Sequence, residues 1–555
     1  MKFIERVIYS IINSKTKKFL VLFITFLAFI GSLMMFPSKL VLAKMLPGKS
    51  ANTFSIYVDT PNGSSIEQTQ KVTMCVNNIL KKEKEILDIE TYLGFGSPLD
   101  YAGLVKGSSL KRGENMAEIV VNLTDLHTRD EKSFIMVHRL RPIIQNRCEK
   151  LVTGTSIKMI EQPAGPPTLA SIVVELYGND DVKLRDVALQ VADILKNTDD
   201  LVDVDVMQDE IYKKFELSVN KEKVIRSGLS IEQVNQILYL AFEGMKIAVK
   251  NSENSPEQIP LFLSLSDETK RLESFSKHKL ADKLSSLKLM NKQGMMIAVN
   301  ELVTINEVDS IPTIMSKNLK KMVNVIAETD LVSQVYPLLD ARAKIIEHFS
   351  REYEVKNTHL FNLELKDKKT GEIINLDWDG EMKVTMDTFR DLGAAFISAL
   401  VLIFLLLVIY YKGFALSGII LLGSFLSIIG VIVGHWVVDI FTVDTFFLTA
   451  TSLIGFIALM GISSRNSLLL IDFAISLISD GMEKKRAIAV ATATRSKPIF
   501  LTAAAIILAS TLLANDPIFG GLGVALIFGT IAAVIVSLLF VPILMDNTKA
   551  IKEDN

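Results

Sequence analysis

An arginine within a long apolar segment is the residue of this sequence with the most definite chemical consequence. Arg465 follows the apolar run Thr449–Leu459 and precedes a second apolar stretch that ends near Asp472. A guanidinium at the centre of a bilayer costs about 3 kcal/mol or more, so it must face the interior of a helix bundle and meet an acid there. Asp472 lies two helical turns further on and shares the face of Arg465, but its place near the end of the run makes it a weak partner. The acid must therefore come from elsewhere in this chain or from another chain.

Six apolar segments are candidates for membrane-spanning helices. Most match the roughly 20 residues that a helix needs to cross the hydrocarbon. The first is longer than the apolar part of a signal peptide, which is about 7–15 residues, and no small-residue cleavage site follows it, so we interpret it as a retained span. One span therefore precedes a large polar insertion and five follow it. The segments are Phe19–Leu40, Leu392–Tyr411, Phe414–Trp436, Phe446–Ile475, Ile499–Ala514 and Leu522–Leu544.

The basic residues of the short connections predict the orientation of these spans. Lysines and arginines concentrate in the N-terminal segment, around Lys412, in the stretch 484–497 and at the C-terminus, and these four segments fall on one side of a six-span bundle. The alternate connections carry only acids, namely Asp439, Asp444 and Asp516. Because basic loops remain in the cytoplasm, we expect a multi-pass membrane protein with both termini in the cytoplasm and the insertion on the extracytoplasmic side.

The insertion alternates strand and helix patterns. Its first part has the order βαββαβ, which is the ferredoxin-like pattern. A second unit of this kind starts after Gly165-Pro166-Pro167 and is interrupted by short strands and polar loops. The predicted fold class is thus a membrane protein with a 1+5 six-helix bundle and an α+β insertion. The predicted parts are a first span (1–45), a first ferredoxin-like unit (46–165), a second such unit in two pieces (166–243 and 313–378), an excursion from it (244–312) and five spans (379–555).

This layout resembles the C-terminal half of the resistance–nodulation–division (RND) family of efflux permeases, of the hydrophobe and multidrug type. The resemblance covers essentially the whole chain, and the motifs occur in the family's order. They are Gly461-x-x-x-Arg465-Asn466 with Asp472-Phe473, then Arg495-x-Lys497-Pro498-Ile-x-x-Thr502, then Val541-Pro542, and upstream Val219-Asn-Lys-Glu-Lys-x-x-x-x-Gly228-x-Ser230. The resemblance implies that the two ferredoxin-like units are porter units, that the excursion is a docking subdomain, and that the chain lies in a bacterial inner membrane with its insertion in the periplasm.

The resemblance implies a proton relay within the membrane. Arg465 falls on the family's relay lysine, Thr502 on its threonine and Arg495 on its arginine, with Asp472 and Asn466 as accessory positions. Arginine does not release its proton in a protein, so Arg465 could act only as a fixed counter-charge. Each of these residues also has a purely structural interpretation. Arg465 could extend its side chain to the membrane surface, and Arg495 could be one of the basic residues that anchor the cytoplasmic side. Thr502 could form a hydrogen bond within its own helix, Asp472 could be a charge at the end of a helix, and Asn466 could stabilise the packing between helices.

The family's pair of intramembrane aspartates is missing from this sequence. The resemblance therefore implies an N-terminal-half RND polypeptide that supplies the pair, together with a periplasmic adaptor, an outer-membrane channel and a trimeric assembly. Whether the chain is a natural split subunit or a fragment stays open. The implied function is proton-driven export of small amphiphilic compounds. The alternatives are export of soft metal ions or lipids on the same fold, and a scaffold that transports nothing.

Several other functions are disfavoured by the composition. The net charge is −2, which favours no nucleic-acid partner, and no phosphate-binding loop or nucleophile–base set marks an enzyme or a cofactor site. The six histidines are scattered and the two cysteines lack metal-ligand spacing, so no metal site is expected. Cys75 and Cys148 lie on the two helices expected in the first porter unit. A disulfide is permitted there, but two buried thiols are the favoured interpretation.

Overall fold

The structure is a computed structural model of the full chain. The described residues are 2–48, 50–98, 100, 103–108, 111–162, 165–254, 258–272, 274–442, 444–549 and 551. The chain divides into two compact units, one formed by Met1–Met207 with Met315–Asn555 and the other by Gln208–Ile314.

A four-stranded antiparallel sheet begins the larger unit. Its strands follow the order β2-β3-β1-β4, and two helices, α3 and α5, pack together and share its apolar core. Branched and aromatic residues fill the buried face of the central strand β1. The elements are β1 (Thr53–Asp59), α3 (Ile66–Leu80), β2 (Ile86–Phe95), α4 (Gly103–Lys106), β3 (Arg112–Leu123), α5 (Ser133–Cys148) and β4 (Ser156–Glu161).

A disulfide between Cys75 and Cys148 joins α3 to α5. The expectation of two free thiols is therefore wrong. The reason is the packing of the two helices side by side, which brings the two Cα atoms to 5.7 Å, within the range that a disulfide spans.

The second sheet of this unit has seven strands in the order β13-β14-β5-β17-β16-β15, with β6 also paired to β14. Helices α6 and α12 share one large apolar core with it. The strand β17 runs through Gly380 directly into the helix α13. The elements are β5 (Ile172–Tyr177), α6 (Asp181–Lys196), β6 (Leu201–Met207), β13 (Met315–Lys317), β14 (Lys320–Thr329), α12 (Val335–Phe349), β15 (Tyr353–Asn357), β16 (Leu363–Asp367) and β17 (Ile373–Asp379).

The smaller unit begins at Gln208, upstream of the excursion expected from residue 244. The reason is that β7 (Lys213–Val219) pairs with β12 (Val303–Asp309) and not with the seven-stranded sheet. Between these strands, the described part of the chain forms five helices and two hairpins. The helices are α7 (Lys221–Arg226), α8 (Ile231–Phe242), α9 (Asp267–Lys270), α10 (Lys277–Ser286) and α11 (Val299–Leu302). The hairpins are β8 (Met245–Lys250) with β9 (Ile259–Leu263), and β10 (Lys288–Met290) with β11 (Met296–Ala298).

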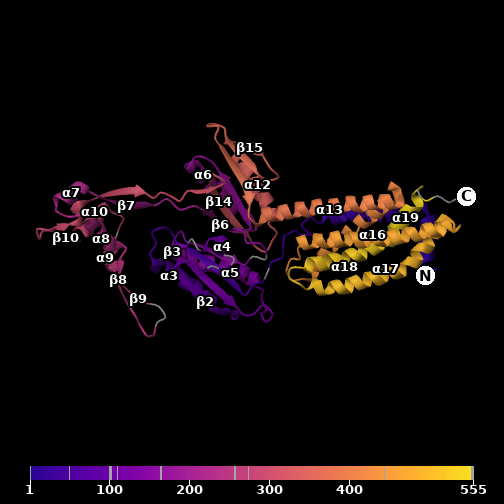
Figure 1. Ribbon diagram of the computed structural model, residues 1–555, viewed down its shortest axis with the longest axis horizontal. Helices are drawn as coiled ribbons and strands as arrows, with labels where there is room; N and C mark the ends of the chain where they lie inside the picture. The colour runs from indigo at the N-terminus through magenta and orange to yellow at the C-terminus, as the bar shows by residue number, and fades with distance from the viewer. Residues whose placement is uncertain are drawn as a thin grey trace. The chain divides into compact units, whose positions relative to one another are not determined.

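Among the described residues, six helical segments are long and apolar enough to cross a membrane. They contact one another as a bundle, in which the N-terminal segment is indigo and the later segments are orange and yellow in Figure 1. The segments are α2 (Lys15–Met34), α13 (Glu381–Tyr411), α14 with α15 (Phe414–Phe425 and Ile428–Phe441), α16 (Ala450–Ser479), α17 (Lys484–Ala514) and α18 with α19 (Gly520–Ile535 and Val541–Asn547, joined by the π-helical turn Val536–Phe540).

Candidate functional site

Arg465 lies at the middle of α16. It is fifteen residues after Ala450 and fourteen before Ser479, which places it about 21 Å from either end of the helix. Its side chain is exposed, and none of the described side chains of this chain forms an ion pair or hydrogen bond with it. Gly461, one turn away on the same face, has no atom within 4 Å of where a Cβ would stand. The guanidinium therefore points out of this chain at mid-helix depth.

Arg495 and Thr502 lie on α17, the antiparallel neighbour of α16. The guanidinium of Arg495 stands 4.9 Å from the centre of the Phe473 ring. Counting back along the two antiparallel helices from this contact brings Thr502 level with Asn466, next to Arg465. The structure thus brings Arg465, Asn466 and Thr502 to one depth and leaves Arg495 about two turns away. The Thr502 hydroxyl is exposed and donates to the carbonyls of Pro498 and Ile499 at 3.1 and 3.0 Å.

Asp472 is held by two tyrosines from the end of α13. The hydroxyls of Tyr410 and Tyr411 donate to its carboxylate at 3.1 and 2.6 Å. It lies about 10 Å along the helix from Arg465 and forms no ion pair with it. The acid that would balance Arg465 is therefore not Asp472.

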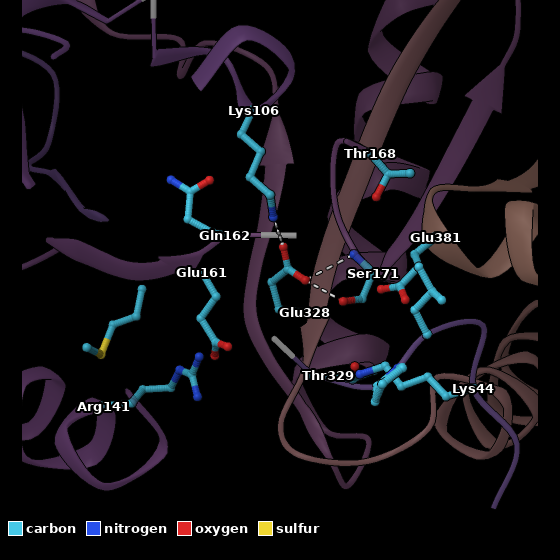
Figure 2. A pocket seen from close by; sticks show the side chains of 14 residues that line it. Lys44, Lys106, Arg141, Glu161, Gln162, Thr168, Ser171, Glu328, Thr329 and Glu381 are labelled. Carbon is cyan, nitrogen blue, oxygen red and sulfur yellow. Dashed lines mark hydrogen bonds and ion pairs between the residues drawn. The ribbon is translucent and has the colours of Figure 1, made fainter. Parts of the chain in front are cut away.

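A charged cavity of about 120 Å³ lies between the four-stranded and the seven-stranded sheet. Figure 2 shows Lys106 of α4 reaching the carboxylate of Glu328 on β14, with which it forms an ion pair. The backbone N–H of Ser171 donates to the same carboxylate at 3.0 Å, and its hydroxyl donates as well. Burial opposes the charge on Glu328, but Lys106 and the Ser171 donors outweigh it and hold the pKa of Glu328 below its usual range.

Glu161 lines the same cavity in a different electrostatic state. Burial raises the pKa of Glu161 above its usual range, although Arg141 and Lys44 act in the opposite direction. Its carboxyl forms no hydrogen bond with another described residue. One wall of the cavity therefore carries a carboxyl that takes up a proton more readily than the paired Glu328.

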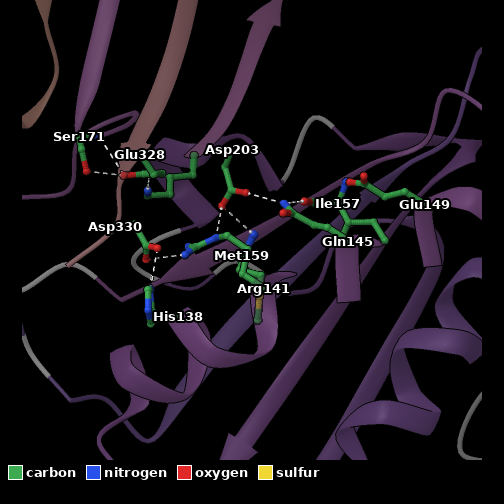
Figure 3. Close-up of polar contacts among 11 residues, drawn as sticks. His138, Arg141, Gln145, Glu149, Ile157, Met159, Ser171, Asp203, Glu328 and Asp330 are labelled. Atoms are coloured by element: carbon green, nitrogen blue, oxygen red, sulfur yellow. Dashed lines mark hydrogen bonds and ion pairs between the residues drawn. The ribbon is translucent and has the colours of Figure 1, made fainter. Parts of the chain in front are cut away.

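A buried ion-pair cluster ties the two sheets together beside the cavity (Figure 3). Arg141 of α5 donates from Nε to Asp203 at 3.3 Å and from Nη1 to Asp330 at 2.8 Å. Asp203 also accepts from the Gln145 side chain at 3.0 Å and from the Met159 N–H at 3.1 Å. Four donor–acceptor contacts thus cross from the first sheet and its helix to the second.

The backbone at Asp203 is unusual for a strand. Its φ is +53°, and the pairing of β6 with β14 shifts register around it, which marks a β-bulge. A non-glycine residue in this region of backbone space is strained, and such strain is kept where the surroundings over-determine it. The bulge turns the carboxylate out of its own sheet towards Arg141. Burial raises the pKa of Asp203, and Arg141 offsets this only in part.

The family model described as the AcrB/AcrD/AcrF family matches residues 4–546. The chain belongs to this family. The expectation of an RND efflux permease is thereby confirmed. The chain is 23% identical over 540 residues to the swarming motility protein SwrC of Bacillus subtilis, covering 95% of this chain and 46% of SwrC. It is 22% identical over 521 residues to the multidrug export protein AcrF of Escherichia coli, covering 90% and 45%.

The fold agrees with solved structures of a heavy metal efflux pump. In crystal form II the TM-score is 0.73 at 18% identity, over 97% of this chain and 51% of the pump chain. Crystal form I gives the same score and identity over 98% and 51%. The chain therefore spans about half the length of the relatives it matches.

Two features of this AcrB/AcrD/AcrF-family chain were not predicted from its sequence. The first is the charged contact between the sheets. Asp203 and Asp205 alternate with valines in β6, and this pattern of acids on one strand face was a signal for such a contact. Lys158, which pairs with Asp205 and Asp59, alternates similarly in β4. The second is His435, which is buried within an apolar run and was counted only among the scattered histidines.

Proposed function

We propose that this chain is the C-terminal-half subunit of an RND-type, proton-driven efflux permease. It would export small amphiphilic compounds from the inner membrane or periplasm towards an outer-membrane channel. The single observation that carries the proposal is the exposed Arg465 at the middle of α16, which has no partner among the described residues of this chain. A permanent charge at this depth is stable only against a carboxylate supplied from outside.

The partner would be an N-terminal-half RND polypeptide that carries the Asp pair. The open face around Gly461, which leaves room for a closely approaching helix, supports this arrangement. In the complete assembly the bundle has one span before and five after the periplasmic insertion, both termini are cytoplasmic, and three such pairs work with an adaptor protein and an outer-membrane channel.

Within the relay, Arg465 acts as a fixed positive charge and Thr502 as the hydroxyl at the same depth. The accessory residue Asn466 lies at this depth as well, and Arg495 and the accessory Asp472 lie about two turns away, towards the cytoplasmic end. While the partner's aspartates are ionised they pair with Arg465, and when they take a proton the attraction is lost. The helices then shift relative to each other, and α13 carries the shift into the second sheet through Gly380.

The two sheets would serve as ferredoxin-like porter units, and the strand order β2-β3-β1-β4 supports this assignment for the first of them. The smaller unit would be the docking subdomain. Opening the space between the sheets requires the Arg141 cluster and the Lys106–Glu328 pair to separate, so these contacts set the cost of admitting cargo.

Soft-metal export is the second candidate for cargo, because two solved structures of similar fold are those of a heavy metal efflux pump. Among the described residues, no group of three or more histidine, cysteine or acidic side chains is placed to hold a metal ion. Thioether ligands would be needed instead, so growth of a deletion strain on silver or copper salts, compared with growth on dyes, separates the two cargoes. Lipid export is tested in the same strain.

Dye efflux from cells carrying Arg465→Ala tests the proposal. We expect efflux to fall to the level of the deletion strain, because the aspartates lose their counter-charge. Leu469→Ala, on the same exposed face of α16 and one turn away, is the matched control and should leave efflux near wild type. Unchanged efflux in Arg465→Ala with normal expression would favour a scaffold that transports nothing.

A further inference from the structure

One further ionisable side chain lies inside the membrane bundle and has no place in the proposed relay. His435 is fully buried in α15, six residues before the end of the helix at Phe441, or about 9 Å from it. Its Nδ1 is 2.7 Å from the Val431 carbonyl oxygen and its Nε2 is 2.8 Å from the Ser452 hydroxyl. A carbonyl only accepts, so Nδ1 carries the proton and the Nε2 of the neutral ring accepts from Ser452.

The Ser452 hydroxyl is the first of three hydroxyls in a chain. It lies 3.0 Å from the hydroxyl of Thr449, which lies 2.8 Å from that of Thr451. Thr451 donates to the Ile518 carbonyl, in the turn before α18, at 3.2 Å. A Cβ on Gly521 would stand only 2.4 and 2.5 Å from the Ser452 and Thr449 oxygens. Glycine at this position lets the start of α18 close directly over the hydroxyls.

The hydrogen bonds among His435 and the three hydroxyls can be satisfied whether the imidazole ring is neutral or protonated. With a neutral ring, Ser452 donates to His435, Thr449 to Thr451, and Thr451 to Ile518. With a proton on Nε2, the ring donates to Ser452, and Ser452 turns to donate to Thr449 across the 3.0 Å contact. The other two bonds stay as they were. One hydroxyl rotation therefore accommodates the imidazolium, and no buried donor is left without an acceptor.

The charged groups at this end of the bundle are mainly acidic. Asp439 accepts from the Phe446 N–H at 2.6 Å, Asp516 accepts from the N–H groups of Ile518 and Phe519, and Asp444 pairs with Lys132. Lys44 stands over the Phe447 ring at 5.5 Å. None of these groups is a hydrogen-bond partner of the ring. Burial of the ring opposes a positive charge on it, so the imidazolium depends on the hydrogen bonds of the three hydroxyls.

We propose that His435 is a proton-binding site of the membrane domain, and that its proton exchanges through Ser452, Thr449 and Thr451 with the surface at Ile518. Histidine is the side chain whose ordinary pKa lies nearest neutrality, and His435 is the one histidine in the described spanning helices. Arginine side chains keep their proton in proteins, so we assign the proton-responsive role to His435 and not to Arg465. The physiological use of the site rests on the proposed function; the binding itself does not.

Nuclear magnetic resonance of the full chain, ¹⁵N-labelled on histidine and held in lipid nanodiscs, tests the site directly. His435→Gln identifies the resonances among those of the six histidines. At pH 8 we expect Nδ1 of His435 to be protonated and Nε2 to be unprotonated. We expect Nε2 to gain a proton as the pH is lowered towards 4.5. An Nε2–H tautomer at pH 8, or a ring that stays neutral throughout this range, would overturn the proposal.

Ser452→Ala and Ser463→Ala form the matched pair of variants. Ser452→Ala removes the acceptor of the imidazolium, so the titration midpoint of His435 should fall by about one pH unit or more. Ser463, equally buried on α16 but outside the hydroxyl chain, should leave the midpoint unchanged when replaced. Equal titration midpoints of His435 in the wild type and in Ser452→Ala would contradict the proposed role of the three hydroxyls. These titrations involve no transport, so their outcome is independent of the efflux result for Arg465→Ala.

Discussion

Asp203 is a residue whose backbone and side chain serve different sheets. Its strained φ belongs to β6, while its carboxylate is buried against Arg141 of α5, the helix that packs on the first sheet. An isolated carboxylate would not survive such burial, and here it accepts from Arg141, Gln145 and Met159. Strain at this position is therefore offset by a contact between two parts of the fold that move apart in the proposed mechanism.

Replacing Asp203 tests this account at the scale of one residue. We expect Asp203→Ala to destabilise the larger unit by about 3–5 kcal/mol, because it leaves Arg141 with one of its two buried partners. Thermal unfolding in detergent measures the loss. Asp205→Ala, whose carboxylate pairs with Lys158 but is 37% exposed, is the control and should cost clearly less. Equal losses of stability in the two variants would show that the cluster around Arg141 stabilises the fold no more than the pair of Asp205 with Lys158 does.

The pH dependence of the contact between the sheets follows from the same residues. Burial raises the pKa values of Asp203 and Glu161 in the closed contact, so protonation favours closure between neutral pH and about 4. Glu328 has a lowered pKa, so its contribution is lost only as the pH falls further. Spin labels on Asn146 of α5 and Lys196 of α6 should show a narrower, shorter distance distribution at pH 5 than at pH 8.

The variant Asp203→Asn with Glu161→Gln is the control for this measurement. It removes both groups that titrate in this window, so its distance distribution should not change between pH 8 and pH 5. A wild-type distribution that broadens on acidification would contradict the predicted direction of the pH effect.

At the scale of elements, the joint between β17 and α13 is built for rigidity. Gly380 has φ +83° and ψ −158°, and a Cβ there would stand 2.5 Å from the Ala170 carbonyl oxygen. Only glycine adopts this conformation at low cost. The strand and the membrane helix therefore meet without a flexible linker, so a displacement of one must be passed to the other.

Gly380→Ala should weaken this joint. The backbone conformation alone costs about 1–3 kcal/mol, and the close contact with Ala170 adds to it. Gly371→Ala is the matched control, because Gly371 also has a positive φ but nothing within 4 Å of its Cβ position. We expect a larger drop in thermal stability for Gly380→Ala than for Gly371→Ala. Equal drops would mean that the contact with Ala170 is not a constraint.

At the scale of the whole molecule, the parts set by apolar periodicity could be predicted from the sequence. Helix α12 was expected at Val335–Phe349 and is found there, and the six membrane segments match six apolar runs. Features that depend on contacts between distant segments could not be predicted. The pairing of β7 with β12 and the disulfide between Cys75 and Cys148 are set by packing, for which local pattern gives no signal.

The same distinction between local pattern and tertiary contact holds for the residues of the candidate site. The depth of Arg465 follows from its place in an apolar run, and the structure places it at mid-helix. The bulge at Asp203 and the hydroxyl chain at His435 arise from tertiary contacts among residues that look ordinary in sequence. Whether Arg465, Thr502 and Arg495 act as a relay stays a prediction that rests on the family motifs.

The most direct test of the account asks what lies opposite Arg465 in the native membrane. A cysteine at this position, with Leu402→Cys on the exposed face of α13 as the control, can be cross-linked with short bifunctional reagents. We predict that Arg465→Cys links to an intramembrane segment of N-terminal-half RND sequence that carries the aspartate pair, and that Leu402→Cys does not. Labelling of Arg465→Cys by lipid-phase reagents alone, with no protein partner recovered, would contradict the central claim.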